Sequence, residues 1–160
     1  MEPETDRSLI EDARRLLGEC VLFRGLGPDE RKALFARVRI RIRNFAPGET
    51  IFLKGSPGDN MMAVLSGNVR ISVASTNGPA LVLASLLPGE LFGEIAVLDG
   101  KDRTADATAA TECALAILDR SEILSFLERH PGAWPYIVAV LCDRLRKNGE
   151  HFAEVLRDRT

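Results

Sequence analysis

The chain has 160 residues, and its 21 Lys and Arg against 23 Asp and Glu give a formal net charge of −2. This length fits one domain that buries a core without a metal or a disulfide, and a slightly acidic chain has no global positive field to attract nucleic acid or an anionic membrane. The chain has three cysteines, Cys20, Cys113 and Cys142, which lie far apart. Three is fewer than the four thiolates of an iron–sulfur cluster, and the odd number without a C-x-x-C pair predicts reduced thiols in a cytoplasmic protein. No apolar run approaches 18 residues and the first residues are acidic, so we expect neither a membrane span nor a signal peptide.

Two packing helices are expected at the start of the chain. Residues 9–17 carry apolar side chains at helical spacing and are closed by Gly18, so we assign residues 1–18 to an N-terminal tail and helix. A second helix is expected after Gly27, with Pro28 in its first turn.

The apolar period changes to two from residue 37 onward, where Val38, Ile40 and Ile42 alternate with Arg37, Arg39, Arg41 and Arg43. This alternation predicts a strand with one apolar face and one face of arginines. The arginines fit the solvated outer face of a sheet, which we favour because the chain is acidic overall. The alternative is a docking stripe for an acidic partner or for DNA.

Six further strands are expected, at residues 50–53, 61–65, 69–74, 81–87, 104–109 and 113–118. Gly and Pro separate nearly all of them, and Asn77-Gly78 is typical of a hairpin turn. Many short strands with such turns predict a sandwich, roll or barrel. The pattern is interrupted between Phe92 and Arg103, where a closed set of strands would leave a concave mouth for a ligand.

The interrupting segment places a carboxylate and a guanidinium on either side of a short turn. Gly93 lets the backbone approach a ligand, and the amides of Ile95 and Ala96 point donors at an anion if they open a short helix. Arg103 can grip phosphate oxygens while Glu94 accepts from a ribose hydroxyl and Thr104 adds a donor. A ligand that carries both groups is a nucleotide. The alternative is a plain salt bridge between Glu94 and Arg103.

The helical period returns after Asp119. Asp119 and Glu122 predict a capping box, followed by a buried stripe that ends near His130. We expect the last helix to begin at Pro131 or Pro135, because proline is costly inside a helix, and the single Trp134 to anchor the core.

The last helix carries a heptad seam about two and a half repeats long. Its steps of three and four residues run through Val138, Leu141, Leu145, Asn148, Phe152 and Val155. Asn148 is a polar insertion of the kind that fixes register between paired helices. The seam predicts a homodimer, and the alternative is that the helix packs this face on its own domain.

Together these motifs resemble cyclic-nucleotide-binding domains. Residues 92–98 followed by Arg103-Thr104-Ala105 are similar to the family's phosphate-binding cassette, F-G-E-[LI]-A-L and then R-[TS]-A, and residues 141–146 look like the dimerisation helix of regulators related to the catabolite activator protein. The resemblance implies an α+β, mainly β fold: an eight-stranded double-stranded β-helix, or jelly-roll-like β-roll, flanked by N-terminal helices and a long C-terminal helix. It assigns residues 19–130 to the nucleotide-binding β-roll, 92–105 to the cassette and 131–160 to a lid and dimerisation helix.

The resemblance also implies a function, that of the sensor domain of a Crp/Fnr-type transcription regulator whose ligand, cAMP or cGMP, closes the last helix and modulates a homodimer. The phosphate and ribose would be held by Gly93, Glu94, Ile95, Ala96, Arg103, Thr104 and Ala105. The base would be contacted by Ile71, Leu83, Leu86, Arg144 and Asn148. Gly149 offers no side chain where the cAMP-responsive activator uses a hydroxyl, so the base preference stays open.

Two other functions compete with this one. The chain could be a stand-alone module that regulates a partner such as a kinase or channel, or a degenerate member that kept the fold and dimer without binding. The sequence offers no nucleophile–base pair and no metal-ligand cluster, so we expect no enzyme, no catalytic residue, no metal and no catalytic cofactor. The chain ends about where a helix-turn-helix would begin, so we expect no DNA binding by this chain itself and no membrane partner.

Overall fold

The computed structural model describes residues 4–19 and 27–158, and Cys20 lies outside them. Both expected N-terminal helices form, as α1 (Glu4–Glu19) and α3 (Pro28–Arg37). The second has Pro28 in its first turn, where a missing N–H costs nothing, and two acidic residues at the positive end of its dipole. Residue 37 therefore belongs to a helix, and the expected arginine strand begins later than the alternation suggested.

Eight strands form two antiparallel four-stranded sheets. One sheet has the order β1-β8-β3-β6 and the other β2-β7-β4-β5. Seven strands match the expected ones within a few residues, and the eighth, β6, is only two residues long. The bounds are β1 Ile40–Phe45, β2 Thr50–Phe52, β3 Asn60–Ser66, β4 Val69–Val73, β5 Leu81–Leu86, β6 Leu91–Phe92, β7 Asp106–Ala109 and β8 Cys113–Asp119.

The core has two layers because β3 and β8 are buried on both faces. Met62 and Val64 of β3 point between the two sheets, where they meet Leu115 and Ile117 of β8. The alternate residues of the same strands form a second cluster with the helices, including Met61, Ala63, Ala116 and Leu118. A mainly β roll with helices packed on one sheet is the fold that the sequence predicts.

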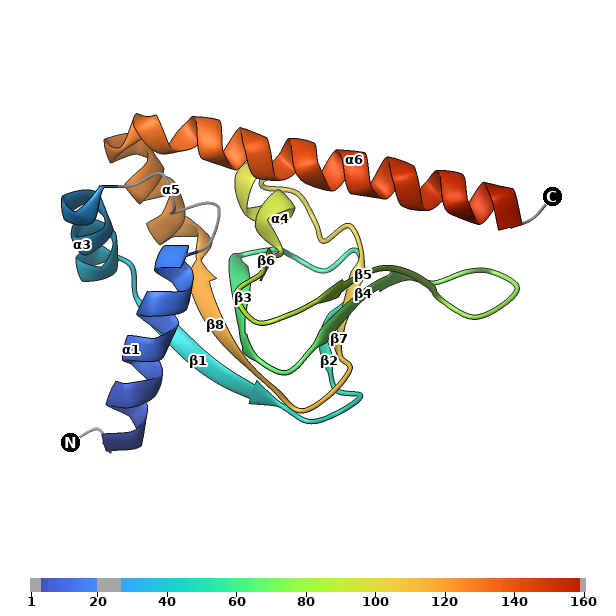
Figure 1. Cartoon of the computed structure of the whole chain (residues 1–160), viewed down its shortest axis with the longest axis horizontal. Helices are drawn as coiled ribbons and strands as arrows, with labels where there is room; N and C mark the ends of the chain where they lie inside the picture. The colour runs from blue at the N-terminus through green and yellow to red at the C-terminus, as the bar shows by residue number, and fades with distance from the viewer. Residues whose placement is uncertain (1–3, 20–26, 159–160) are drawn as a thin grey trace.

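Four further helical segments lie among residues 27–158: α4 (Glu94–Asp99), α5 (Arg120–Arg129), a 3₁₀ turn (Pro131–Ala133) and α6 (Trp134–Asp158). The helix α6 runs across α4 and extends along the side of the roll that carries β4 and β5 (Figure 1). Pro135 sits in its first turn. None of the helices in the described ranges is long and apolar enough to cross a membrane.

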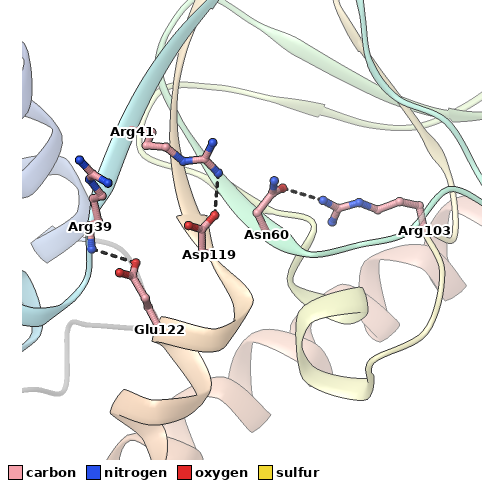
Figure 2. A network of polar contacts seen from close by, with 6 residues as sticks. All are labelled: Arg39, Arg41, Asn60, Arg103, Asp119 and Glu122. Atoms are coloured by element: carbon pink, nitrogen blue, oxygen red, sulfur yellow. Dashed lines mark hydrogen bonds and ion pairs between the residues drawn. The ribbon is translucent and has the colours of Figure 1, made fainter.

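Two expectations around α5 and α6 are wrong. Trp134 is 41% exposed, because Ala133 of the preceding 3₁₀ turn and Ile137 of α6 take the buried positions. The capping box also does not form, since Asp119 caps α5 with no side-chain hydrogen bond. Its carboxylate instead accepts from Arg41 of β1 at 2.6 Å, and Glu122 accepts from the backbone N–H of Arg39 at 2.9 Å (Figure 2).

Candidate functional site

A pocket of about 600 Å³ lies between β4 and β5, the segment around α4, and one face of α6. Its volume falls within the range of small-molecule sites, roughly 300–1,000 Å³. Apolar side chains from β4 and β5 line one part, and charged side chains from α4, from residue 103 and from α6 line the rest. The lining includes Phe52, Ile71, Leu83, Leu86, Glu94, Ala96, Arg103, Thr104, Asp143, Arg144, Lys147 and Asn148.

The helix α4 is set by glycines at its two ends. Gly93 before it and Gly100 after it both adopt left-handed backbone, with φ of 78° and 73°. A Cβ at Gly93 would stand 2.6 Å from Nη1 of Arg103, so only glycine leaves room for the guanidinium beside this turn. From the other side, a Cβ at Gly58 would stand 2.1 Å from Cβ of Ala96, so the β2–β3 loop packs directly on α4.

Arg103 is held in place from several directions. Its Nη1 donates to the carbonyl of Gly93 at 2.9 Å, and its Nη2 donates to Oδ1 of Asn60 at 2.7 Å (Figure 2). The guanidinium also lies over the ring of Phe52, 4.2 Å from its centroid. The residue is only 5% exposed. Its Nε is buried without a hydrogen-bond partner in the part of the chain that the structure describes. Burial lowers the pKa of the guanidinium, and the charges of Asp59 and Glu94 oppose this shift.

Glu94 is the first residue of α4 and is almost completely buried. Nε of Arg144 lies 3.0 Å from its Oε1, as an ion pair without hydrogen-bond alignment, and both carboxylate oxygens lack a hydrogen-bond partner among the described residues. Burial raises the pKa of this carboxyl, and Arg144, the backbone and Arg103 oppose the rise. A buried carboxylate with two unused acceptor oxygens can receive donors from a ligand.

The helix α6 closes the pocket through one face. Besides pairing with Glu94, Arg144 donates from Nη2 to the carbonyl of Leu91, so a single side chain holds α6 to the segment before α4. Asp143 and Lys147 form an ion pair of 3.1 Å on the same helix face, and Asn148 follows. This face places both donors and acceptors opposite the apolar floor formed by β4 and β5.

A match to a family model identifies the kind of domain that contains this pocket. The model described as "Cyclic nucleotide-binding domain" matches residues 42–130, which is more than half of the chain. The chain belongs to this family. The match spans seven of the eight strands completely, together with α4, Glu94 and Arg103.

Known members of the family support the assignment. The chain is 36% identical over 126 residues to the cyclic AMP receptor protein of Thermus thermophilus, covering 79% of this chain and 57% of that protein. It is 29% identical over 141 residues to a CRP-like cAMP-activated global transcriptional regulator of Mycobacterium tuberculosis, covering 88% and 62%. The crystal structure of the Thermus thermophilus catabolite activator protein superposes with a TM-score of 0.71 at 33% identity, covering 84% and 62%. The chain thus spans about 60% of the length of these relatives.

Every residue that the sequence predicts to contact a ligand lines this one pocket of the cyclic-nucleotide-binding domain. The set expected around phosphate and ribose, Gly93, Glu94, Ile95, Ala96, Arg103, Thr104 and Ala105, meets the set expected around the base, Ile71, Leu83, Leu86, Arg144 and Asn148. The alternative salt bridge between Glu94 and Arg103 is not what the described residues form, because Glu94 pairs with Arg144 and Arg103 bonds to Gly93 and Asn60.

Sequence reasoning missed several residues that shape the site. Phe52 and Asn60 support Arg103 from strands that no local pattern connects to it. Asp143 and Lys147 also line the pocket. Lys147 is three residues after Arg144 and four after Asp143 on the same helix, so a spacing argument could have found this pair. Among the described residues, no group of three or more His, Cys, Asp and Glu side chains is placed to hold a metal ion.

The residues of the expected dimer seam differ in how exposed they are and in what they contact. Val138 and Leu145 are 53% and 72% exposed, whereas Leu141 is half-buried against the core of its own domain. Asn148 lines the pocket. The side chains of Phe152 and Val155 lie outside the described ones.

Proposed function

We propose that this chain binds a cyclic nucleotide in the pocket beneath α6, with Arg103 on the cyclic phosphate and Glu94 on the ribose hydroxyl. The observation that carries this proposal is the pair of buried charges with unused hydrogen-bonding capacity. A guanidinium has five N–H donors, and the two bonds to Gly93 and Asn60 leave three, including the unpartnered Nε. Neither oxygen of Glu94 accepts a hydrogen bond from the described residues, although Oε1 is ion-paired with Arg144.

The remaining lining suits a purine. Ile71, Leu83 and Leu86 give an apolar floor on which a flat base can rest, and Arg144 and Asn148 of α6 lie where they can contact its edge. An asparagine amide can pair with an adenine edge through one donor and one acceptor. The names of the similar proteins from Thermus and Mycobacterium specify cyclic AMP, so cAMP is the first ligand to test and cGMP the matched competitor.

We further propose that the bound nucleotide acts on α6 and, through it, on a homodimer of a Crp-type transcription regulator. Arg144 links α6 to Glu94, so a ligand hydroxyl that shares this carboxylate changes the contact that holds the helix. Val138, Leu145 and Leu156 are exposed apolar side chains on the same helix and offer a surface for a second copy. Regulation of a partner protein by a chain without DNA-binding activity is the alternative outcome.

Calorimetric titration with cAMP and with cGMP tests the binding proposal. Arg103→Lys keeps the charge but loses the planar fork, and we expect it to weaken binding at least tenfold, because a charge-assisted bond is worth about 1.5–3 kcal/mol. Arg70→Lys is the matched control, since Arg70 is exposed on β4 and does not line the pocket. Unchanged affinity in Arg103→Lys, or no binding of either nucleotide by the folded wild-type protein, contradicts the proposal.

A further inference from the structure

Arg120 is the first residue of α5, and neither its own helix nor the pocket lining explains its position. A cation at the amino end of a helix meets the positive end of the helix dipole, which is unfavourable. The first turn of α5 therefore gains nothing from this side chain. The contacts that account for the position of Arg120 lie in another part of the fold.

The side chain of Arg120 reaches the carboxyl end of α4. Its Nε donates to the carbonyl of Val97 at 2.9 Å, and this carbonyl belongs to the last turn of α4, whose acceptors have no partner within the helix. A Cβ at Gly100 would stand 3.0 Å from Nη2 of Arg120, so the guanidinium lies over the glycine that ends α4. A cation at this end is favourable both for the dipole and for the free carbonyls.

The backbone of Arg120 is itself anchored beside the other arginine of the site. Its N–H donates to the carbonyl of Asp59 at 2.8 Å. The next residue, Asn60, accepts from Arg103 at 2.7 Å. Two neighbouring residues at the start of β3 thus hold Arg103 at one end of α4 and Arg120 at the other.

We propose that Arg120 is a positioning residue of the nucleotide site: by fixing the carboxyl end of α4 it aims Glu94, at the amino end, toward the ribose. The inference rests on the proposed function, because it takes Glu94 as the acceptor of the ribose hydroxyl. Ala96 packs on Gly58 in the middle of α4 and provides a pivot. Glu94 lies two residues, about 3 Å along the helix axis, from this pivot. A rotation of about 18° about the pivot therefore moves the start of α4 by about 1 Å, enough to misalign a hydrogen bond.

The test compares cAMP with 2′-deoxy-cAMP, which lacks the hydroxyl that Glu94 would accept from. The ratio of the two dissociation constants reports on this one contact, whereas general loss of structure weakens both ligands alike. We expect the wild-type protein to favour cAMP about tenfold or more, and Glu94→Gln to abolish most of that preference. Arg120→Met, which removes the donor, is expected to reduce the ratio at least threefold, and Arg120→Lys to restore part of it.

Arg129→Met is the matched control, because Arg129 is an exposed arginine in the last turn of the same helix and should leave the ratio unchanged. If Arg120→Met does not fold, Arg120→Gln, which keeps a neutral donor, replaces it and is expected to reduce the ratio about twofold. An unchanged ratio in a folded Arg120 variant overturns the inference while cAMP binding stands. Absence of cAMP binding by the wild-type protein removes the proposed function itself.

Discussion

The two partners of the ion pair between Glu94 and Arg144 are buried to different degrees, and this predicts unequal costs in stability for removing one or the other. The side chain of Glu94 is 2% exposed and that of Arg144 is 30% exposed. Removing the arginine leaves a buried carboxylate without its main counter-charge, whereas removing the carboxylate leaves a cation that water can still reach. Loss of one partner from a buried pair costs about 3–5 kcal/mol. We expect Arg144→Met to fall at the lower end, about 3 kcal/mol at neutral pH, because this pair is partly solvated.

The pH dependence identifies the cause of that loss. Burial raises the pKa of Glu94 in the folded protein above its ordinary value, and Arg144→Met raises it further because the arginine opposes the rise. At pH values below the ordinary range of a glutamate, both the folded and the unfolded chain carry the proton, and the variant loses little on this account. As pH rises, the unfolded chain ionises first, so the free energy of unfolding falls until the folded carboxyl has also ionised.

Urea denaturation between pH 4 and pH 8 measures this effect. We expect the free energy of unfolding of Arg144→Met to lie closest to that of wild type at the acidic end, where the lost hydrogen bond to Leu91 is the main difference. At the other end it should fall about 3 kcal/mol below wild type. The double variant Glu94→Gln/Arg144→Met should recover most of the loss. Arg146→Met, an exposed neighbour on α6, is the control. A loss that is the same at all pH values, or a double variant as unstable as Arg144→Met, would refute the argument.

Two further predictions concern packing and thiol chemistry. Gly58→Ala should destabilise the fold by about 1–3 kcal/mol in thermal denaturation, because the new methyl would stand 2.1 Å from that of Ala96; Gly132→Ala, which meets nothing within 4 Å, should be nearly neutral. With Cys20 replaced by serine, a thiol reagent at pH 8 should modify exposed Cys142 quickly and Cys113 only on unfolding, since burial and Glu49 raise the pKa of the Cys113 thiol. Comparable modification rates in the native protein would contradict the second prediction.

The parts of the fold that local chemistry decides were predictable from the sequence. Pro28 marks the start of α3 because its ring and missing N–H fit only the first turn. The left-handed glycines at residues 93 and 100 bound α4 for a similarly local reason. The meeting of the twelve ligand-lining residues in one pocket was not decided by spacing, and it was the resemblance to a family that brought them together.

Other features depend on contacts between residues far apart in the chain, and local sequence patterns could not predict them. The Asp119 carboxylate accepts a hydrogen bond from Arg41, 78 positions away, and not from the backbone of α5. The capping box therefore does not form, and no local sequence pattern indicates Arg41 as the partner. The strand β6 has two residues, too few to show an alternation. Asn60 and Arg120 also have no motif of their own, because their roles exist only once β3, α4 and α5 are assembled.

The register of α6 is the clearest case in which the structure adds to the sequence. The heptad through Val138, Leu141 and Leu145 has a competitor with the same spacing rule, which replaces Leu141 by Cys142 and Asn148 by Gly149. Leu141 is half-buried against its own core, whereas its competitor Cys142 is exposed. Asn148 and Gly149 are both exposed, but only Asn148 lines the pocket. We therefore favour the competing register for the homodimer proposed above, since a face occupied within the domain has less surface to offer a second copy.

Oxidative crosslinking distinguishes the two registers. In a parallel, two-fold symmetric helix pair, a residue at a seam position faces its own copy, so the competing register brings two Cys142 thiols together, whereas a register through Leu141 turns them away from the seam. Cα atoms about 4.4–6.8 Å apart can form a disulfide. With the other cysteines replaced by serine, mild oxidation should give a disulfide-linked dimer on a non-reducing gel, and Leu145→Asp should abolish it by burying a charge in the seam. A dimer that persists in solution without any crosslink would instead support the register through Leu141, because exposed thiols held face to face have no reason to stay reduced under oxidation.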